Sequence, residues 1–445
     1  MRLSAAMTWS AIAALALAVL PLLARNLAMI PAHVPLDPNE GWNAAHALSA
    51  MAGAPLYPPP GAQMVNNYPP LSFYIVGAMA KLTGDAIVAG RLLAGLAFLL
   101  VCGGIACLSR QMECGARSAL FAMLFFAGVL LIGSDYVAMD DPQLLGHAVQ
   151  IAGLGLALRH RPIAAAALFA ASLFIKHNLL ALPLATGLWL LWQERRAGLQ
   201  YLLWGTAFAL AGLVAFRLGF GVSLWSQLAT PRLSSAANLR TALLHLWWAP
   251  LPLLTLQGLR EDRFSLFCFL YAAIALALGL VFAAGDGVDS NAFFDLALAL
   301  SLALGLILNH GRRTVLAAAS ALPLLAFLAF HVTDNNFFFT RDFAAQSARD
   351  IAFLQAHPGP ALCDQLSLCL WAGKGAEVDV FNVGEAIKRG ARDSAPLAAM
   401  IASRHFAAIQ LGDLDALGPQ VRAALQTHYR PDHADDNGLF LIPDR

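Results

Sequence analysis

The sequence predicts an α-helical membrane protein with many spans, followed by a small α/β domain. Two observations carry this prediction. Hydrophobic residues make up 59% of the 445 residues and charged residues only 12%, whereas an average soluble domain is about 25% charged. The charges are also spread unevenly, because residues 1–331 carry 31 charged side chains and the much shorter segment 332–445 carries 24. We therefore expect a membrane domain over residues 1–331 and a soluble domain over residues 332–445.

Apolar segments that can cross the hydrocarbon layer define the expected spans. A layer of about 30 Å needs about 20 helical residues. This length predicts about eleven spans, at residues 5–24, 86–109, 117–133, 143–158, 162–175, 179–192, 198–217, 246–259, 264–283, 291–309 and 314–331. The net charge of +1 gives no indication of nucleic acid as a partner, and the apolar spans make membrane lipids the expected surroundings of this chain.

The distribution of Lys and Arg predicts the orientation of the spans, because cytoplasmic loops are enriched in these residues. Alternate short connections carry arginine pairs, and together with Arg2 they place eleven cations on one side. We assign that side to the cytoplasm. The first outer loop, residues 25–85, and the soluble domain, residues 332–445, then face the opposite side of the membrane.

Acidic residues gather on the expected outer side, where nine of the 13 acidic residues of the membrane domain lie. Asp37 and Glu40 are in the first outer loop, and Asp140 and Asp141 are in the second, directly before Pro142. Longer outer loops collect polar residues in any case, and an acidic residue before a proline also caps a helix. However, two adjacent carboxylates are costly to ionise unless a metal, a cation or a proton is shared. A carboxylate-lined outer site is therefore our expectation.

The first outer loop has internal structure of its own. The runs GWNAAHALSAMAG and LSFYIVGAMAKL each have helical spacing but are too short to cross the membrane. Proline-rich sequence, LYPPP and NYPP, separates them and cannot form regular helix interior. Two helices at the membrane interface, joined by a stiff strap, form a lid or a wall rather than a simple connection.

The order of these motifs resembles a known family of membrane enzymes. An acidic NEG motif, a short helix ending in glycine, LYPPP and NYPPLSFY are followed by MDDPQLL, FIKHNLLALP and GDGVDSNAFFDLALAL. This order is similar to the GT-C glycosyltransferases of the protein O-mannosyltransferase and aminoarabinose-transferase type, over almost the whole chain. The family usually carries Asp-Glu in tandem, whereas Asn39-Glu40 stands here with Asp37 three positions before Glu40. The resemblance leaves open which carboxylate is catalytic.

The resemblance implies a sugar transfer from a polyprenyl-phosphate carrier to an acceptor outside the cytoplasmic membrane, on its periplasmic or exterior side. It implies Glu40 and Asp141 as the principal catalytic carboxylates, with Asp37 and Asp140 as alternatives. A divalent metal held by Asp141 and Glu40 is also open. The remaining roles are donor-phosphate binding by Lys176, His177 and Arg91, and substrate-loop contacts by Tyr68, Pro69, Pro70 and Asn291. The acceptor can be a glycan, a lipid or a protein.

Arg91 has a separate argument, because it lies five residues inside its expected span, where an unpaired charge is costly and usually functional. Its expected partners are Asp85, Asp141 or the donor phosphate. Lys176 and His177 have an alternative explanation, in which their polar ends simply reach the membrane interface. For Asn291 the alternative to ligand binding is helix capping.

The soluble domain reads as mixed α/β, with short strands at ALCDQL, FAAIQL and GLFLIP and helical sequence between them. Cys363 and Cys369 are the two cysteines outside the cytoplasm and the spans, so we expect a disulfide between them. Two small buried side chains are the alternative.

A rival for the whole chain is a polytopic transporter or lipid flippase, although the sequence shows no inverted repeat.

Overall fold

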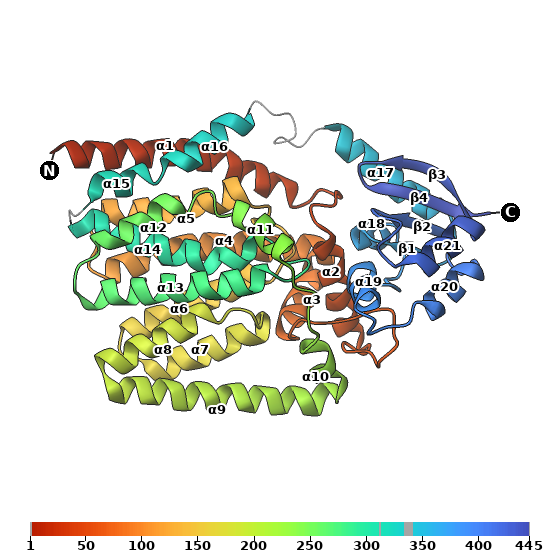
Figure 1. Ribbon diagram of the computed structural model, residues 1–445, viewed down its shortest axis with the longest axis horizontal. Coiled ribbons are helices and arrows are strands. Elements are labelled where there is room, and N and C mark those ends of the chain that lie inside the picture. Colours follow the sequence, from red (N-terminus) through yellow and green to blue (C-terminus); the bar gives the residue numbers. More distant parts are fainter. Residues whose placement is uncertain (1, 311–312, 333–340, 445) are drawn as a thin grey trace.

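The computed structural model describes residues 2–310, 313–332 and 341–444. It shows a multi-pass membrane protein built from a helical bundle with a small α/β domain at one end (Figure 1). Six helical segments of the described chain are long and apolar enough to cross a membrane. These are α1 (Arg2–Met29), α4 (Ala86–Gln111), α5 (Ala116–Gly133), α9 (Arg195–Phe220), α13 (Arg263–Ala283) and η2 (Ser290–Phe293) with α14 (Phe294–His310).

Shorter helices complete the bundle, and two expected spans are not single helices. The shorter helices are α6 (Gln143–Leu158), α7 (Pro162–Ile175) and α8 (Ala181–Gln193). The prediction of one helix over residues 246–259 is wrong, because turns separate α11 (Ala236–Leu244) from α12 (Pro250–Thr255), which continues directly into the short 3₁₀ helix η1 (Leu256–Gly258). The span expected at 314–331 is divided into α15 (Thr314–Ala319) and α16 (Leu322–Val332). Prolines at the start of α12 and α16 explain both breaks, since proline cannot extend a preceding helix.

The core of the bundle surrounds α14, whose side chains are almost all buried between α5 and α13. This burial agrees with its sequence, since a helix that is apolar on every side belongs in an interior or in lipid. In contrast, α9 packs on α7 and α8 and leaves most of its apolar side chains exposed at the edge of the bundle. An exposed apolar helix of this length has the surface that a lipid bilayer covers.

The first loop forms the two short helices that the sequence predicts, α2 (Pro38–Ala52) and α3 (Leu71–Thr83). Asp37 caps α2 by accepting a hydrogen bond from the backbone N–H of Asn39 (2.7 Å), and Gly53 ends it in the left-handed conformation with φ 70°. The proline-rich strap between the helices is fixed by its own contacts, including a 2.7 Å bond from the Tyr57 hydroxyl to the Tyr68 carbonyl. The loop is therefore an ordered wall at one end of the bundle.

The soluble part, residues 341–444, contains a four-stranded sheet in the order β1-β2-β4-β3. The strands are β1 (Ala361–Cys363), β2 (Ala408–Leu411), β3 (Tyr429–Asp435) and β4 (Gly438–Pro443), of which only the β1–β2 pair is parallel. Its helices are α17 (Arg341–Ala356), α18 (Leu366–Trp371), α19 (Val380–Lys388), α20 (Ala395–Ala402) and α21 (Pro419–His428). Cys363 and Cys369 form a disulfide between β1 and α18. We call these residues the tail domain.

The tail domain sits on the first loop, at the end of the bundle that also holds α2 and α3 (Figure 1). The Trp42 indole donates to the carboxylate of Asp379 (2.9 Å), and the Trp371 indole donates to Asp85 (3.0 Å). Trp42 of α2 thus lies in a packed interface between the first loop and the tail domain. Residues 25–85 and the tail domain consequently share one side of the bundle.

Candidate active site

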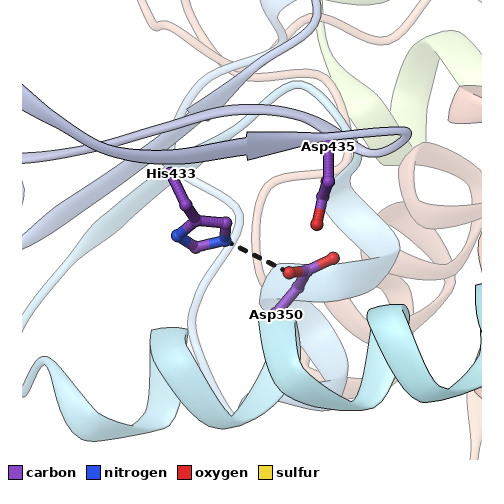
Figure 2. A group of neighbouring side chains, drawn as sticks. All are labelled: Asp350, His433 and Asp435. Atoms are coloured by element: carbon purple, nitrogen blue, oxygen red, sulfur yellow. Dashed lines mark hydrogen bonds and ion pairs between the residues drawn. The ribbon is translucent and has the colours of Figure 1, made fainter.

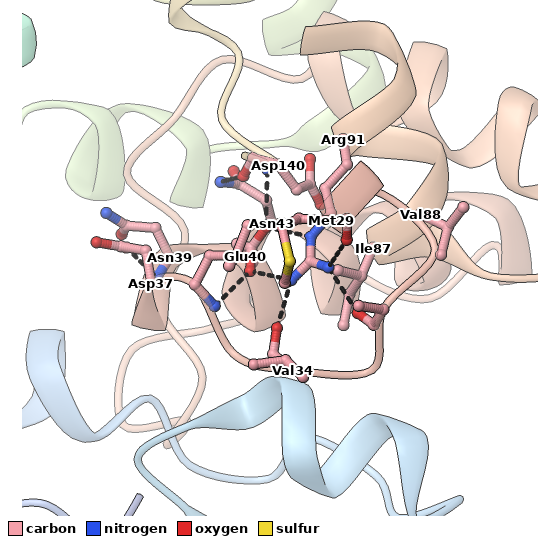
Figure 3. A network of polar contacts seen from close by, with 12 residues as sticks. Met29, Val34, Asp37, Asn39, Glu40, Asn43, Ile87, Val88, Arg91 and Asp140 are labelled. Atoms are coloured by element: carbon pink, nitrogen blue, oxygen red, sulfur yellow. Dashed lines mark hydrogen bonds and ion pairs between the residues drawn. The ribbon is translucent and has the colours of Figure 1, made fainter. Parts of the chain in front are cut away.

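A buried salt bridge between Glu40 and Arg91 joins the first loop to α4 (Figure 3). The Arg91 guanidinium donates from Nε and Nη2 to the two oxygens of Glu40, both at 2.7 Å, and neither side chain is exposed. The remaining guanidinium contacts are backbone carbonyls, those of Met29, Ala32 and Val34. The expectation that Arg91 pairs with Asp85 or Asp141 is wrong, because its partner is Glu40. No contact of Arg91 in this arrangement faces a donor phosphate.

Glu40 also accepts two backbone hydrogen bonds, from the N–H of Leu36 (3.0 Å) and of Asp140 (3.1 Å). A carboxylate offers about four lone-pair positions, and four donors fill them here. Glu40 therefore ties the first loop to the second loop and to α4. With no free oxygen, it is poorly placed to take a proton from a substrate.

Asp141 forms a second buried pair, with Lys176 at the end of α7. The Lys176 Nζ lies 2.7 Å and 2.9 Å from the two carboxylate oxygens, and both side chains are buried. Asp141 also accepts a hydrogen bond from the backbone N–H of Gln143 (2.7 Å) at the start of α6. The helix-capping role considered for Asp141 therefore accounts for one of its contacts. The Tyr68 ring covers the ammonium at 4.9 Å. An ammonium has three N–H donors, and Asp141 occupies two of them.

Asp140 lies between the two salt bridges. Its backbone carbonyl accepts from the Asn43 amide (2.8 Å), and its Oδ2 has no partner among the described residues. The carboxyl packs against Gly90 of α4 so closely that a Cβ at this position would overlap it. Burial, and then the charges of Glu40 and Asp141, raise the pKa of Asp140 well above its ordinary value. Its charged form is thus disfavoured, and its burial makes Asp140 inaccessible to a bulky substrate.

Asp37 differs from the other three carboxylates because it is half-buried and has no cationic partner among the described residues. Burial raises the pKa of Asp37 to about 6, with the charges of Asp141, Glu40 and Asp289 adding to the effect and the bond from the Asn39 N–H opposing it. A carboxyl with this pKa can accept a proton and release it near neutral pH. Asp37 therefore has a proton affinity that suits proton exchange near neutral pH.

A cavity of about 360 Å³, which we call the outer pocket, lies next to the Asp141–Lys176 pair: Lys176 lines it, whereas none of the four carboxylates does. Four segments form its wall: the first loop, residues 176–180 after α7, residues 228–234 before α11, and residues 281–291 from the end of α13 into η2. Its polar lining includes Asn67, Tyr68, Lys176, His177, Asn178, Arg232 and Asn291, and its apolar lining includes Leu228, Val281, Phe282 and Val288. A cationic rim next to an apolar wall suits an amphipathic molecule with an anionic head.

Four of the expected donor and substrate-loop residues line this pocket: Lys176, His177, Tyr68 and Asn291. Pro69 and Pro70 do not line it; they are buried at the start of α3. Burial, and then the neighbouring cations Lys176 and Arg232, lower the pKa of His177 to about 4. His177 is therefore neutral at pH 7 and can form hydrogen bonds to a ligand without adding charge.

Arg232 is a lining residue that the sequence-based candidates did not include. Its guanidinium is bonded to Glu385 of α19 (3.0 Å) and lies over the Phe381 ring (5.1 Å). The sequence feature that could have indicated Arg232 is that it is one of the few cations in the outer connections. The placement of a second cation next to Lys176 depends on the tail domain, which sequence spacing does not place.

A metal held jointly by Glu40 and Asp141 does not fit this geometry. The Glu40 and Asp141 carboxylates are neighbours through the backbone of Asp140, but four donors fill Glu40, and Lys176 with Gln143 occupies Asp141. Metal ligation would require an exchange of these bonds, so no step is derived through a metal at this site.

A larger cavity, of about 510 Å³, opens at the other end of the bundle, between the end of α8 and the start of α13. Its charged lining, Arg260, Glu261, Asp262 and Arg263, comes from one short connection. Asp262 is committed to capping α13 through the N–H groups of Phe264 and Ser265. The larger cavity therefore lacks the buried, paired charges that the outer pocket combines from several segments.

The fold is shared with solved structures of ArnT from Cupriavidus metallidurans. The structure of ArnT bound to undecaprenyl phosphate has a TM-score of 0.64 and 14% sequence identity, over 96% of this chain and 97% of that chain. The apo structure has a TM-score of 0.65 and 14% identity, over 98% of both chains. Neither a protein-family model nor a curated protein sequence matches this chain. At this identity the likeness concerns the fold, and it confirms the expected GT-C-like architecture over nearly the whole chain.

Proposed function

We propose that this protein is a membrane glycosyltransferase that moves a sugar from a polyprenyl-phosphate carrier to an acceptor held at the outer pocket. The observation that carries the proposal is the pairing of two cations, Lys176 and Arg232, with an apolar wall in one cavity, where Lys176 is held by the carboxylate of Asp141. The shared fold supports it, since one of the similar structures holds undecaprenyl phosphate. The protein would lie in the cytoplasmic membrane, with this pocket facing the periplasm or the exterior.

In this mechanism the acceptor's nucleophilic atom attacks the anomeric carbon of the sugar. The bond from that carbon to the phosphate oxygen breaks, and its electron pair stays on the lipid phosphate. Lys176 and Arg232 stabilise the charge that develops there, as fixed cations do for leaving groups in a water-poor site. Asn291 and the neutral His177 provide hydrogen bonds to the same group.

Asp37 takes the proton that the acceptor loses. We assign the base to Asp37 instead of Glu40 or Asp141 because those two carboxylates are held by Arg91 and Lys176. Glu40 is a positioning residue that holds the two outer loops together. Asp141 holds Lys176 at the pocket wall and caps α6.

The test is release of polyprenyl phosphate by purified protein in lipid nanodiscs, given a panel of polyprenyl-phosphate-linked sugars and read by mass spectrometry. Asp37→Asn keeps the cap of α2, because asparagine caps about as well as aspartate. It should lower the rate by roughly 10²–10⁴, the usual cost of losing a general base. Asp262→Asn alters an equivalent cap at the other end of the bundle and should leave the rate within a few-fold of wild type.

Two results would count against these assignments separately. Absence of polyprenyl phosphate release from every donor would contradict the transferase. Wild-type rates in Asp37→Asn would remove Asp37 from the mechanism while leaving the reaction itself in place.

A further inference from the structure

A group of potential metal ligands lies in the tail domain, away from the outer pocket. Asp350 on α17 faces His433 and Asp435 on β3 (Figure 2). One ligand atom from each of the three side chains lies within 4.8 Å of the other two. Asp350 is almost fully buried, and His433 and Asp435 are half-buried. A small movement of side chains would bring all three to coordination distance of one ion.

The His433 ring is held in the orientation that metal-binding histidines adopt. Its Nδ1 lies 2.9 Å from the Asp432 carboxylate, and its Nε2 faces Asp350 at 3.3 Å. The Phe440 ring stacks on the imidazole at 4.3 Å, and the Phe353 ring meets it edge-on at 5.0 Å. A carboxylate on one ring nitrogen fixes the tautomer and directs the other nitrogen to a metal. The aromatic shell restricts the ring and limits access of water.

The two carboxylates are held from the other side by one residue. The Asn437 side-chain amide donates to Asp350 Oδ2 (2.6 Å), and its backbone N–H donates to Asp435 Oδ1 (3.0 Å). The other oxygen of Asp350 faces His433 Nε2, and a ligand oxygen of Asp435 lies within 4.8 Å of both residues' ligand atoms, so an ion bound here would replace the Asp350–His433 contact.

We propose that Asp350, His433 and Asp435 bind a divalent transition-metal cation of the Zn²⁺ type. One imidazole nitrogen and two carboxylate oxygens are ligands that Zn²⁺ accepts with water in its fourth position. The hard cations Ca²⁺ and Mg²⁺ prefer oxygen ligands alone. The ion would join the first helix of the tail domain to its terminal hairpin, since Asp350 and His433 are 83 residues apart in the chain.

The alternative is a metal-free network in which a protonated His433 neutralises the carboxylates. Partial burial of the His433 ring lowers its pKa. The hydrogen bonds to Asp432 and Asp350 oppose this effect, and the pKa of His433 is raised overall. Metal content distinguishes the two cases, because a protonated imidazole cannot ligate.

The experiment uses the full chain in nanodiscs, purified without a polyhistidine tag and stripped with a chelator. After equilibration with Zn²⁺ at pH 7.5 and removal of free ion, bound zinc is counted by mass spectrometry and its affinity is measured by calorimetry. Asp435→Asn and His433→Asn test the ligands. The matched control is Asp436→Asn, which removes the same charge from the adjacent, exposed position of the hairpin. Folding of each variant is checked by thermal unfolding without metal.

The expected result is one Zn²⁺ per wild-type and Asp436→Asn chain, and at least tenfold weaker binding in Asp435→Asn and His433→Asn. Zn²⁺ should also raise the Tm of wild type and not of Asp435→Asn, because an ion that binds only the folded state stabilises it. Equal zinc affinity in Asp435→Asn, no retained zinc in wild type, or tighter binding of Ca²⁺ would each overturn the proposal. None of these readouts depends on glycosyl transfer.

Discussion

At the scale of single residues, the four outer carboxylates have separate roles because their neighbours differ. Arg91 neutralises Glu40, Lys176 neutralises Asp141, and neither cation reaches Asp37. Paired carboxylates inside a protein resist protonation, whereas an unpaired one with restricted solvent has a raised pKa. The same loops therefore supply fixed structural anions and one group that can exchange a proton near neutral pH.

The first prediction concerns pH. If Asp37 is the base, it works only when ionised, and its pKa is raised to about 6. The value of kcat/KM should be level above about pH 7 and fall below pH 6, by about tenfold for each further pH unit. A profile of initial rates from pH 4.5 to 8.5 measures this. A level profile down to pH 5 would assign the proton transfer to a group other than Asp37.

The second prediction concerns Glu40→Gln. Removing one partner of a buried pair leaves the other charge unneutralised and costs about 3–5 kcal/mol. This variant should lower the Tm in detergent strongly, whereas Asp37→Asn should unfold near the wild-type temperature. If Glu40→Gln instead unfolds like wild type but has lost its activity, Glu40 takes part in the chemistry and our assignment of a positioning role is wrong.

Part of this site could be predicted from the sequence. Acidic residues in two outer loops and Lys176 at the end of a span indicated a charged outer site, and the structure brings Glu40, Asp140 and Asp141 together there. The pairing could not be predicted, because it depends on which side chain of the first loop reaches Arg91 in α4. Sequence spacing gives the face of a helix but not its partner across the bundle.

At the scale of elements, helix α19 of the tail domain contacts three of the four segments that form the wall of the outer pocket. The backbone N–H of Asp379, its capping residue, donates to the Gln63 carbonyl (2.9 Å), and Glu385 binds Arg232. Phe381 packs against Gly287, where a Cβ would overlap its ring. One helix thus sets the width of the pocket from outside the membrane.

The third prediction tests this coupling. Glu385 accepts from Arg232 (3.0 Å) and from the Leu233 N–H (2.7 Å). Charged hydrogen bonds of this kind contribute about 1.5–3 kcal/mol, so Glu385→Ala should raise KM for the lipid donor about 10–100-fold and change kcat less. Donor titrations measure both constants. Glu377→Ala, which removes an exposed carboxylate bound to His405, is the control.

An unchanged KM in Glu385→Ala would show that Arg232 holds its position without the tail domain. A loss in kcat alone would move Glu385 from donor positioning to the chemical step, and would equally contradict this role.

Elements were predicted well where apolar runs were long and uninterrupted, and poorly where short segments depend on neighbours. The interfacial helices α2 and α3 and three of the four strands agree with the sequence patterns. Strand β3 was missed because YRPDHAD is polar and contains proline, which argue against a strand. It forms because it pairs with β4 and places His433 next to Asp350.

At the scale of the whole molecule, the bundle and the tail domain enclose a site that neither contains alone. The membrane part supplies Lys176 and the carboxylates, and the tail domain holds Arg232 in place. Length and hydrophobicity predicted about eleven spans, whereas six helical segments of the described chain are long and apolar enough to cross a membrane. The segments at 246–259 and 314–331 are broken before the prolines at the start of α12 and α16. Hydropathy does not distinguish a crossing helix from an apolar segment with turns.

The fourth prediction concerns topology. The Gly61 carbonyl accepts a hydrogen bond from Arg392 of the tail domain (2.6 Å), so the first loop and the tail domain must lie on one side of the membrane. Cysteines placed at Gly61 and Gly375 should both react with an impermeant thiol reagent in intact cells. Glu194→Cys, in a connection at the other end of the bundle, should react only after permeabilisation. Labelling of Gly61 and Gly375 on opposite sides would contradict the fold.

The most direct measurement is an electron cryomicroscopy structure of the protein in nanodiscs with undecaprenyl phosphate. We predict phosphate density in the outer pocket, within hydrogen-bonding distance of Lys176 and Arg232, with the lipid chain leaving along the wall that contains Val281 and Val288. The larger cavity at Arg260 and Arg263, which Glu261 and Asp262 also line, is the comparison site. Phosphate density there, or an outer pocket that stays empty at saturating lipid, would contradict the assignment of the donor site.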